Sequence, residues 1–192
     1  MEKEYLTKPL SYFSHLFGHE GENSLLSYLK EEGYAMALSA GSDNELGVYS
    51  SFTVEVTLTK KGLENYEQVL AAVFKYAQRM AEVGPQEFVF EECKKIGNLK
   101  FDFVDKGNCT NYCVGLARSM PNFPGEEIQH LIRSKYVFDS FDKKRIEEIG
   151  KLLADPKNTI ICFASKTFTD ESLPKKEHWY KIDYSADKYT EE

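Results

Sequence analysis

The chain has 192 residues and a formal net charge of −7, and 42% of its residues are hydrophobic. This is enough to bury the core of one ordinary domain, but an acidic chain without a basic stripe is not typical of nucleic-acid binding. No apolar run reaches the roughly 18–20 residues that span a bilayer, and no apolar leader follows Met1. We therefore expect neither nucleic acid nor membrane as a partner.

Two helices are predicted at the start of the chain. Aromatic and aliphatic residues recur at helical spacing from Leu10 to Phe17, and the pattern stops at Gly18. A second amphipathic helix is expected after Asn23, a residue type that caps helix starts. Gly33 is expected to end it, because glycine accepts the left-handed conformation common just after a helix.

Two strands are predicted next. Larger apolar residues occupy the even positions from Tyr34 to Ala40, and the turn-forming residues Gly41 to Asn44 are expected to end this strand. Apolar and polar residues alternate through the following segment, up to Leu58. This alternation indicates one buried and one wet face, as in an antiparallel pair.

The middle of the chain is predicted to be helical. Spacings of three and four residues indicate a long helix from Thr59 to Gly84 and another from Pro85 to about Phe103. Shorter helices are expected further along, at 112–120, from Pro124, and after Ser140 or Asp142.

The last elements complete a predicted α+β fold. The apolar, β-branched run from Thr159 to Ala164 indicates a buried strand, and the polar and aromatic residues 166–192 a surface tail. Helices grouped between strands favour α+β over alternating α/β, here as a single domain over residues 1–192. Three strands are few for this many helices, so the sheet is small or takes a strand from outside the chain.

The chain carries no complete catalytic motif. His15 and His19 lie one helical turn apart, but Leu16 and Gly18 occupy the places where the zinc motifs H-E-x-x-H and H-x-x-E-H need glutamate. Nucleophile-elbow and phosphate-loop motifs are also missing. We therefore expect no catalytic residue, no metal ligand and no cofactor in this chain.

The cysteines do not suggest a metal or redox motif. Cys93, Cys109, Cys113 and Cys162 form no C-x-x-C pair. Buried free thiols are the simplest interpretation, and free thiols favour a cytoplasmic location. A catalytic cysteine–histidine pair stays open, although no pattern marks one.

Several local patterns resemble the insulysin branch of the pitrilysin-type zinc metallopeptidases. The likeness spans about Leu10 to Tyr184, in order and without large gaps. The family patterns are H-L-x-G-H-E-G with a following S-L-L-x-x-L-K-x-x-G, then L-T-x-x-G-L, G-P-Q-E-x-V-F-x-E-C-K, and S-K-S-F with E-W-Y. The matching segments are His15–Gly21 with Ser24–Gly33, Leu58–Leu63, Gly84–Lys94, and Ser165–Phe168 with His178–Tyr180.

The resemblance points to the family's second, non-catalytic domain. It implies a metallopeptidase/LuxS-like α+β domain, whose antiparallel or mixed sheet is covered by helices on one side. The family's zinc site is an H-x-x-E-H helix of the first domain, which this chain lacks. Zinc would therefore belong to a catalytic domain acting in cis or in trans. In the family a strand precedes the histidine-rich stretch; since only Met1 to Pro9 come before it here, we expect that strand to be shortened or lost.

The resemblance also implies peptide binding. In insulysin-like enzymes the second domain walls a closed chamber and holds the amino terminus of a peptide substrate at an exosite, partly by pairing with a strand edge. Carried over by position, the exosite residues are His15, Gly18, Glu20, Leu38, Ser39, Ala40 and Gly41. A carboxylate such as Glu20 can pair with a terminal ammonium, and a free edge can add an extended peptide. Ser39 and Ala40 stand where the family tends to have valine and glycine.

We therefore expect a non-catalytic, peptide-binding domain that supports proteolysis by a zinc domain not present in this chain. The alternative is a stand-alone interaction or regulatory protein that binds peptides without catalysis. A decayed gene product, prone to aggregate through its exposed strand edge, is a third hypothesis. For single residues, Gly18 as a helix terminator and His15 as a structurally satisfied histidine are the alternatives to a binding role.

Overall fold

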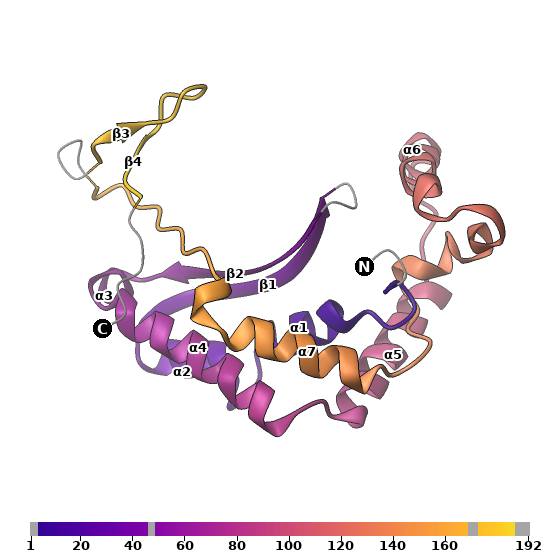
Figure 1. The fold of residues 1–192 in the computed structure, drawn as a ribbon, viewed down its shortest axis with the longest axis horizontal. Helices are drawn as coiled ribbons and strands as arrows, with labels where there is room; N and C mark the ends of the chain where they lie inside the picture. Colours follow the sequence, from indigo (N-terminus) through magenta and orange to yellow (C-terminus); the bar gives the residue numbers. More distant parts are fainter. Residues whose placement is uncertain (1–3, 46–48, 169–172, 187–192) are drawn as a thin grey trace. The chain divides into compact units, whose positions relative to one another are not determined.

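The computed structural model describes residues 4–45, 49–168 and 173–186. The chain separates into two compact units, Met1–Asn158 and Thr159–Glu192, and Figure 1 labels their elements. The second unit contains the short antiparallel strands β3 (Lys175–Lys176) and β4 (Asp183–Tyr184). Among the described residues, no helix has the length and apolar character needed to cross a membrane.

The first unit combines one hairpin with a layer of helices. Its antiparallel strands are β1 (Ala35–Glu45) and β2 (Tyr49–Leu58). Its α-helices are α1 (Pro9–Phe17), α2 (Leu25–Glu31), α3 (Lys60–Glu64), α4 (Tyr66–Val83), α5 (Glu87–Asp102), α6 (Cys109–Ser119) and α7 (Lys143–Ala154). Its 3₁₀ helices are η1 (Met120–Asn122), η2 (Gly125–His130), η3 (Arg133–Lys135) and η4 (Pro156–Asn158).

Short polar side chains fix where several helices begin. The Ser24 hydroxyl accepts a hydrogen bond from the Ser27 amide at 3.1 Å, and the Asp142 carboxylate accepts one from the Arg145 amide at 3.0 Å. Such caps satisfy amide groups that the first helical turn leaves without a partner. Gly84 ends α4 with a φ of 72°, a positive value that glycine adopts readily because it has no Cβ. The predicted helices are thus confirmed, with α3 and α4 separated at Asn65. The expected cap Asn23 is wrong, because the side chain that caps α2 is that of Ser24.

The hairpin has one covered and one exposed face. Leu38 pairs with Val56 and Ala40 with Val54, and these side chains pack against the helical core. The intervening residues of β2, including Thr53 and Glu55, are exposed, so the predicted alternation is confirmed. In Figure 1 the helices α1, α2, α4 and α7 lie on the covered side.

The first strand is longer than the sequence predicts. The segment expected to turn, Gly41 to Asn44, continues β1 and pairs with β2 as far as Glu45 opposite Tyr49. Backbone pairing with a long partner strand therefore outweighs the local turn preference of these residues. The connection at 46–48, with Val48, lies outside the described residues.

A bulge near the start of β1 resets its alternation. Ala35 is opposite Leu58 and Ala37 is opposite Thr57, so one extra residue is accommodated between them. As a result Ala35 and Leu38 are both buried, whereas Met36 is 59% exposed despite its even spacing with Leu38.

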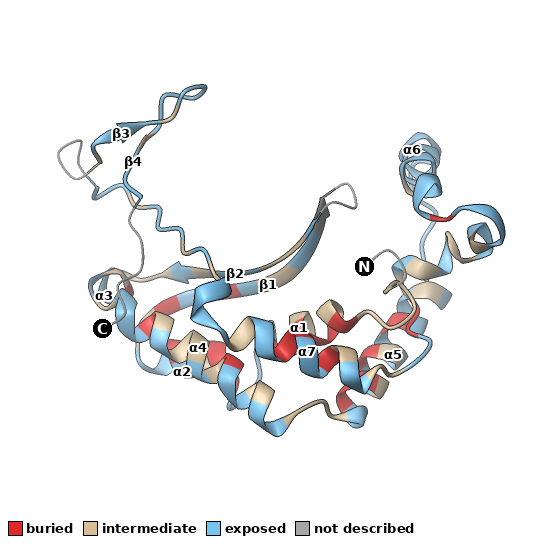
Figure 2. Cartoon of the chain, in the orientation of Figure 1, coloured by how far each residue is buried: buried red, intermediate tan, exposed pale blue. Residues whose placement is uncertain are grey.

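The core lies between the hairpin and the helices. Figure 2 shows buried segments on β1, α1, α4, α5 and α7. Its most enclosed side chains, each below 2% exposure, include Leu26, Leu29, Phe90 and Ile146. Helix α6, by contrast, buries none of its residues. The core therefore anchors α1 and β1, the two elements that carry the expected exosite residues.

The third predicted strand is wrong. Residues Thr159 to Ala164 form no strand, and Ile160 is 90% exposed. A wholly apolar strand is stable when neighbouring strands and both sheet faces cover it, but in the described part of the chain the large sheet has only two strands. The α+β class is confirmed, with a sheet thinner than the sequence indicates.

Candidate functional site

The carboxyl end of α1 carries the first group of expected exosite residues. Helix α1 ends at Gly18, whose amide donates to the Ser14 carbonyl at 2.9 Å. The φ of Gly18 is −81°, so glycine is not required there for a left-handed backbone. A Cβ on Gly18 would, however, lie 2.8 Å from the Ser14 carbonyl oxygen, closer than real Cβ contacts allow. The close approach of the Ser14 carbonyl therefore favours glycine at this helix end.

His15 connects α1 to α5. Its side chain is half-buried, and its Nε2 lies 3.8 Å from Glu92 Oε2. The imidazoles of His15 and His19 have ring centroids 6.5 Å apart. Glu20 is exposed, and no described residue makes a hydrogen bond or ion pair with it. The Glu20 carboxylate is thus free to meet a cation from solution.

The second group lies on β1. Leu38 is buried and Ala40 half-buried against the core, whereas Ser39 lies on the opposite, exposed face. A Cβ added at Gly41 would meet nothing within 4 Å, so no close contact requires glycine there. Among the described residues β1 pairs with β2 on one side only. Its other edge therefore presents unpaired backbone donors and acceptors.

The two groups sit on elements that pack together. Helix α1 contacts β1 from the covered side of the hairpin, as Figure 1 shows. No hydrogen bond or ion pair of the described residues joins the group at His15, Gly18 and Glu20 to residues 38–41. Helix α1, whose carboxyl end precedes Glu20, thus packs against the strand whose other edge is free.

Two tyrosines hold α1 in place. The Tyr76 hydroxyl donates to the Leu16 carbonyl at 3.1 Å, and the Tyr12 hydroxyl accepts from the Gln86 amide at 3.0 Å. Burial raises the pKa of both phenols, so both stay protonated over the physiological range. Sequence reasoning missed these roles, since it took Tyr12 as a member of an apolar helical stripe and did not single out Tyr76.

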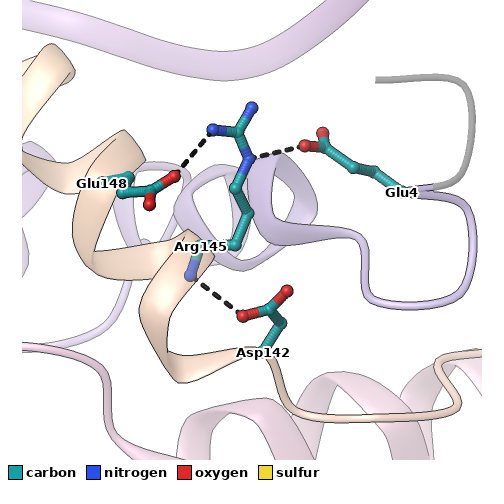
Figure 3. Close-up of polar contacts among 4 residues, drawn as sticks. All are labelled: Glu4, Asp142, Arg145 and Glu148. Carbon is teal, nitrogen blue, oxygen red and sulfur yellow. Dashed lines mark hydrogen bonds and ion pairs between the residues drawn. The ribbon is translucent and has the colours of Figure 1, made fainter.

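An arginine clamp ties the start of the chain to α7. Figure 3 shows Arg145 between two carboxylates: its Nε lies 2.6 Å from Glu4 Oε1, and its Nη1 lies 3.0 Å from Glu148 Oε2. The hydrogen bonds that Arg145 donates to Glu4 and, second in size, to Glu148 raise the pKa of Arg145. Because this cluster fastens the segment before α1 to α7, we interpret it as structural.

The described residues do not form a metal or nucleophile site. They contain no group of three or more His, Cys, Asp or Glu side chains that could hold a metal ion. Burial raises the pKa of Cys93 to about 11, which keeps it a thiol. The prediction of buried thiols holds for Cys93 alone. Cys109 and Cys113 are exposed because α6 buries nothing, and Cys162 is exposed in the second unit.

One apolar cavity of about 190 Å³ lies on the helical side of the first unit. Leu16 of α1, Met80 of α4, Phe88 of α5 and Gly150 of α7 contribute to its walls. It contains none of the expected exosite residues. Two charged residues, Arg79 and Glu147, also belong to its walls.

Two models of one protein family match nearly the whole chain. Residues 2–96 match the model described as the peptidase M16 inactive domain. Residues 101–192 match the model described as the middle or third domain of peptidase M16. The two matches meet within α5, so the chain is similar to parts of two differently described domains.

Full-length relatives are much longer than this chain. It is 33% identical over 189 residues to a nardilysin-like protein of Arabidopsis thaliana and 32% identical over 191 residues to insulin-degrading enzyme of Homo sapiens. These alignments cover 96% and 100% of the chain but 18% of each relative. The crystal structure of pitrilysin superposes with a TM-score of 0.75 and 25% identity, covering 82% of this chain and 16% of that one.

Proposed function

This chain belongs to the insulysin-like members of peptidase family M16 and matches non-catalytic parts of that family; from this premise we propose that it binds peptides for a zinc metallopeptidase. Peptide cleavage is then the task of a zinc domain acting in cis or in trans. The proposal includes a metallopeptidase/LuxS-like fold for the complete domain and a cytoplasmic location. The chain spans less than a fifth of the length of its relatives, so the activity of a larger assembly is also part of this proposal.

The free edge of β1 is the observation that carries the proposal. An extended peptide can pair with such an edge through main-chain hydrogen bonds, whatever its side chains are. Leu38 and Ala40 anchor β1 in the core, so this stretch of the edge is held rigidly. A rigid edge loses little conformational entropy when a peptide pairs with it.

Glu20 is proposed to hold the amino terminus of the peptide. A carboxylate accepts hydrogen bonds from an ammonium group strongly, because both partners are charged. Glu20 is exposed and makes no ion pair within the described part of the chain, so binding breaks no existing contact. In this proposal Gly18, which has no side chain, leaves room for the peptide beside Glu20. His15 holds the end of α1 against Glu92.

The described residues do not fit the family's zinc. No three-ligand cluster exists among them, and the closest histidine pair has rings 6.5 Å apart without an accompanying glutamate motif. The chain alone is therefore expected to hydrolyse nothing. Zinc-dependent peptide hydrolysis by the pure chain would contradict this part of the proposal. A double variant, Glu20→Gln with His15→Ala, is the control: loss of the hydrolysis in it would assign the activity to this chain.

A double-mutant cycle tests the anchoring of the amino terminus. The probes are one extended peptide with a carboxyl-terminal fluorophore, once with a free amino terminus and once acetylated, titrated with the full chain by fluorescence anisotropy. Removing either charge, by acetylation or by Glu20→Gln, is expected to weaken binding about two- to fivefold, the range of an exposed ion pair. Applying both changes is expected to weaken binding no further.

Control experiments separate edge pairing from nonspecific attraction. Glu147→Gln removes the same charge from α7, on the helical side, and is expected to leave the affinity unchanged. A peptide with N-methylated alternate amides cannot pair with a strand edge and is expected to lose binding. If the N-methylated peptide binds as well as the parent, pairing with β1 is wrong.

The stand-alone alternative is distinguished by the size of the native gene product. An immunoblot of cell extract with an antibody against this chain is expected to give a band far above 22.0 kDa if binding serves a catalytic domain in cis. A band near 22.0 kDa, together with peptide binding and no co-purifying peptidase, would instead favour an interaction protein.

A further inference from the structure

The exposed side of the β1–β2 hairpin, here called the outer face, has a distinct charge pattern. Residues directly opposite one another in an antiparallel pair share a face, and Ser39 is opposite Glu55 while Asp43 is opposite Ser51. Gly41 and Thr53 form the pair between them. Both charged side chains of this described stretch, Asp43 and Glu55, are acidic.

These two carboxylates are not neutralised by the described residues. Asp43 and Glu55 are both exposed, and neither has a hydrogen bond or ion pair within residues 4–45, 49–168 and 173–186. Between the free edge of β1 and Glu55, the outer face carries only the small residues Ser39 and Gly41 of β1. A long side chain lying across β1 therefore meets no bulky obstacle before it reaches Glu55.

Strand geometry determines which side chains of a bound peptide can contact the outer face. Neighbouring strands lie about 4.8 Å apart, so a peptide at the free edge of β1 would lie about 10 Å from β2. Side chains alternate between the faces, so every second peptide residue points to the outer face. A lysine or arginine at the position opposite Ser39 is long enough to reach an exposed glutamate such as Glu55 across β1.

We propose that Glu55, assisted by Asp43, makes the β1 edge selective for extended peptides with lysine or arginine at alternate positions. This inference rests on the proposed function, because it requires a peptide paired with β1. The selectivity comes from charge complementarity on the outer face, while the edge itself supplies sequence-independent affinity. Peptides with aspartate or glutamate at the same positions are disfavoured by repulsion.

The test compares two peptides with the same backbone. One carries lysine at alternate positions and the other carries norleucine, and both have a free amino terminus and a carboxyl-terminal fluorophore. The full chain is expected to bind the lysine peptide about two- to fivefold more tightly, as an exposed ion pair allows. The preference is expected to shrink at 1 M salt, where the Debye length falls to about 3 Å.

Two matched variants locate the source of the preference. Glu55→Gln changes one charge on the outer face, and Glu147→Gln changes one charge on α7. The lysine preference is expected to disappear in Glu55→Gln and to persist in Glu147→Gln. Charge reversal by Glu55→Lys is expected to transfer the preference to a peptide with glutamate at the same positions. Circular dichroism melting checks that all three variants fold.

The outcomes separate this inference from the function on which it rests. If neither peptide binds at low salt, the proposed function and this inference both fail. If both peptides bind equally, edge pairing stands and selection by Glu55 is overturned. A lysine preference that survives in Glu55→Gln likewise overturns the inference, because it would reflect only the net charge of the chain.

Discussion

Replacing Gly62 with alanine is expected to destabilise the first unit through one identifiable contact. Gly62 lies in the first turn of α3, and its amide donates to the Thr59 hydroxyl at 2.9 Å. An added Cβ would lie 1.9 Å from the Tyr34 carbonyl oxygen, a backbone atom that cannot rotate away. The same carbonyl accepts a hydrogen bond from the Thr59 amide at 2.9 Å. The substitution therefore disturbs the junction between α2, the start of β1 and α3.

The magnitude follows from three terms. Forcing a methyl group into a packed site costs about 1–3 kcal/mol, and loss of the Thr59–Tyr34 hydrogen bond costs about 1 kcal/mol. Alanine recovers up to about 1 kcal/mol, because it favours helix more than glycine does. The free energy of unfolding should fall by about 1–4 kcal/mol, which corresponds to a melting temperature lower by about 2–16 °C for a chain of this size.

Urea and thermal unfolding followed by circular dichroism measure this change. The matched control is Gly115→Ala in α6, where an added Cβ meets nothing within 4 Å. That substitution is expected to leave stability unchanged or to raise it by up to about 1 kcal/mol. If Gly62→Ala unfolds within about 0.5 kcal/mol of the original chain, the assigned contact between α3 and Tyr34 is wrong.

Three further experiments probe the supports of the site. Tyr12→Phe is expected to lower stability by about 1–2 kcal/mol in urea titrations, because the Gln86 amide loses its acceptor; an unchanged midpoint would contradict this. Cys93, whose pKa is raised to about 11 by burial, should stay unmodified by maleimide at pH 8 while the three exposed cysteines react, as counted by mass spectrometry. Burial lowers the pKa of Lys8 to about 8, against the opposing effect of Asp139. Between pH 8 and 10.5 the unfolded chain then binds more protons at Lys8, so its contribution to stability should rise with pH. Lys8→Met should flatten that rise. Equal slopes of unfolding free energy against pH in the variant and the original chain would refute the assignment to Lys8.

The expected exosite could be named from the sequence, but its supports could not. The patterns around His15 and Glu20 are contiguous and therefore visible in a single sequence. The partner of His15, Glu92, and the partner of Tyr12, Gln86, come from distant elements that meet only in the folded chain. Both residues lie in the matched segment Gly84–Lys94, but no local signal named their partners on α1.

The sequence alone determined the elements whose stability is local. A helix cap such as Asp142, and the alternation of β2, report the preferences of the same residues that form them. Tertiary structure decided the elements that depend on partners. Gly41 to Asn44 became strand because β2 supplies a pairing edge, whereas Thr159 to Ala164 pairs with no described strand and forms none. Strand pairing is a property of two segments, and a single stretch of sequence describes only one of them.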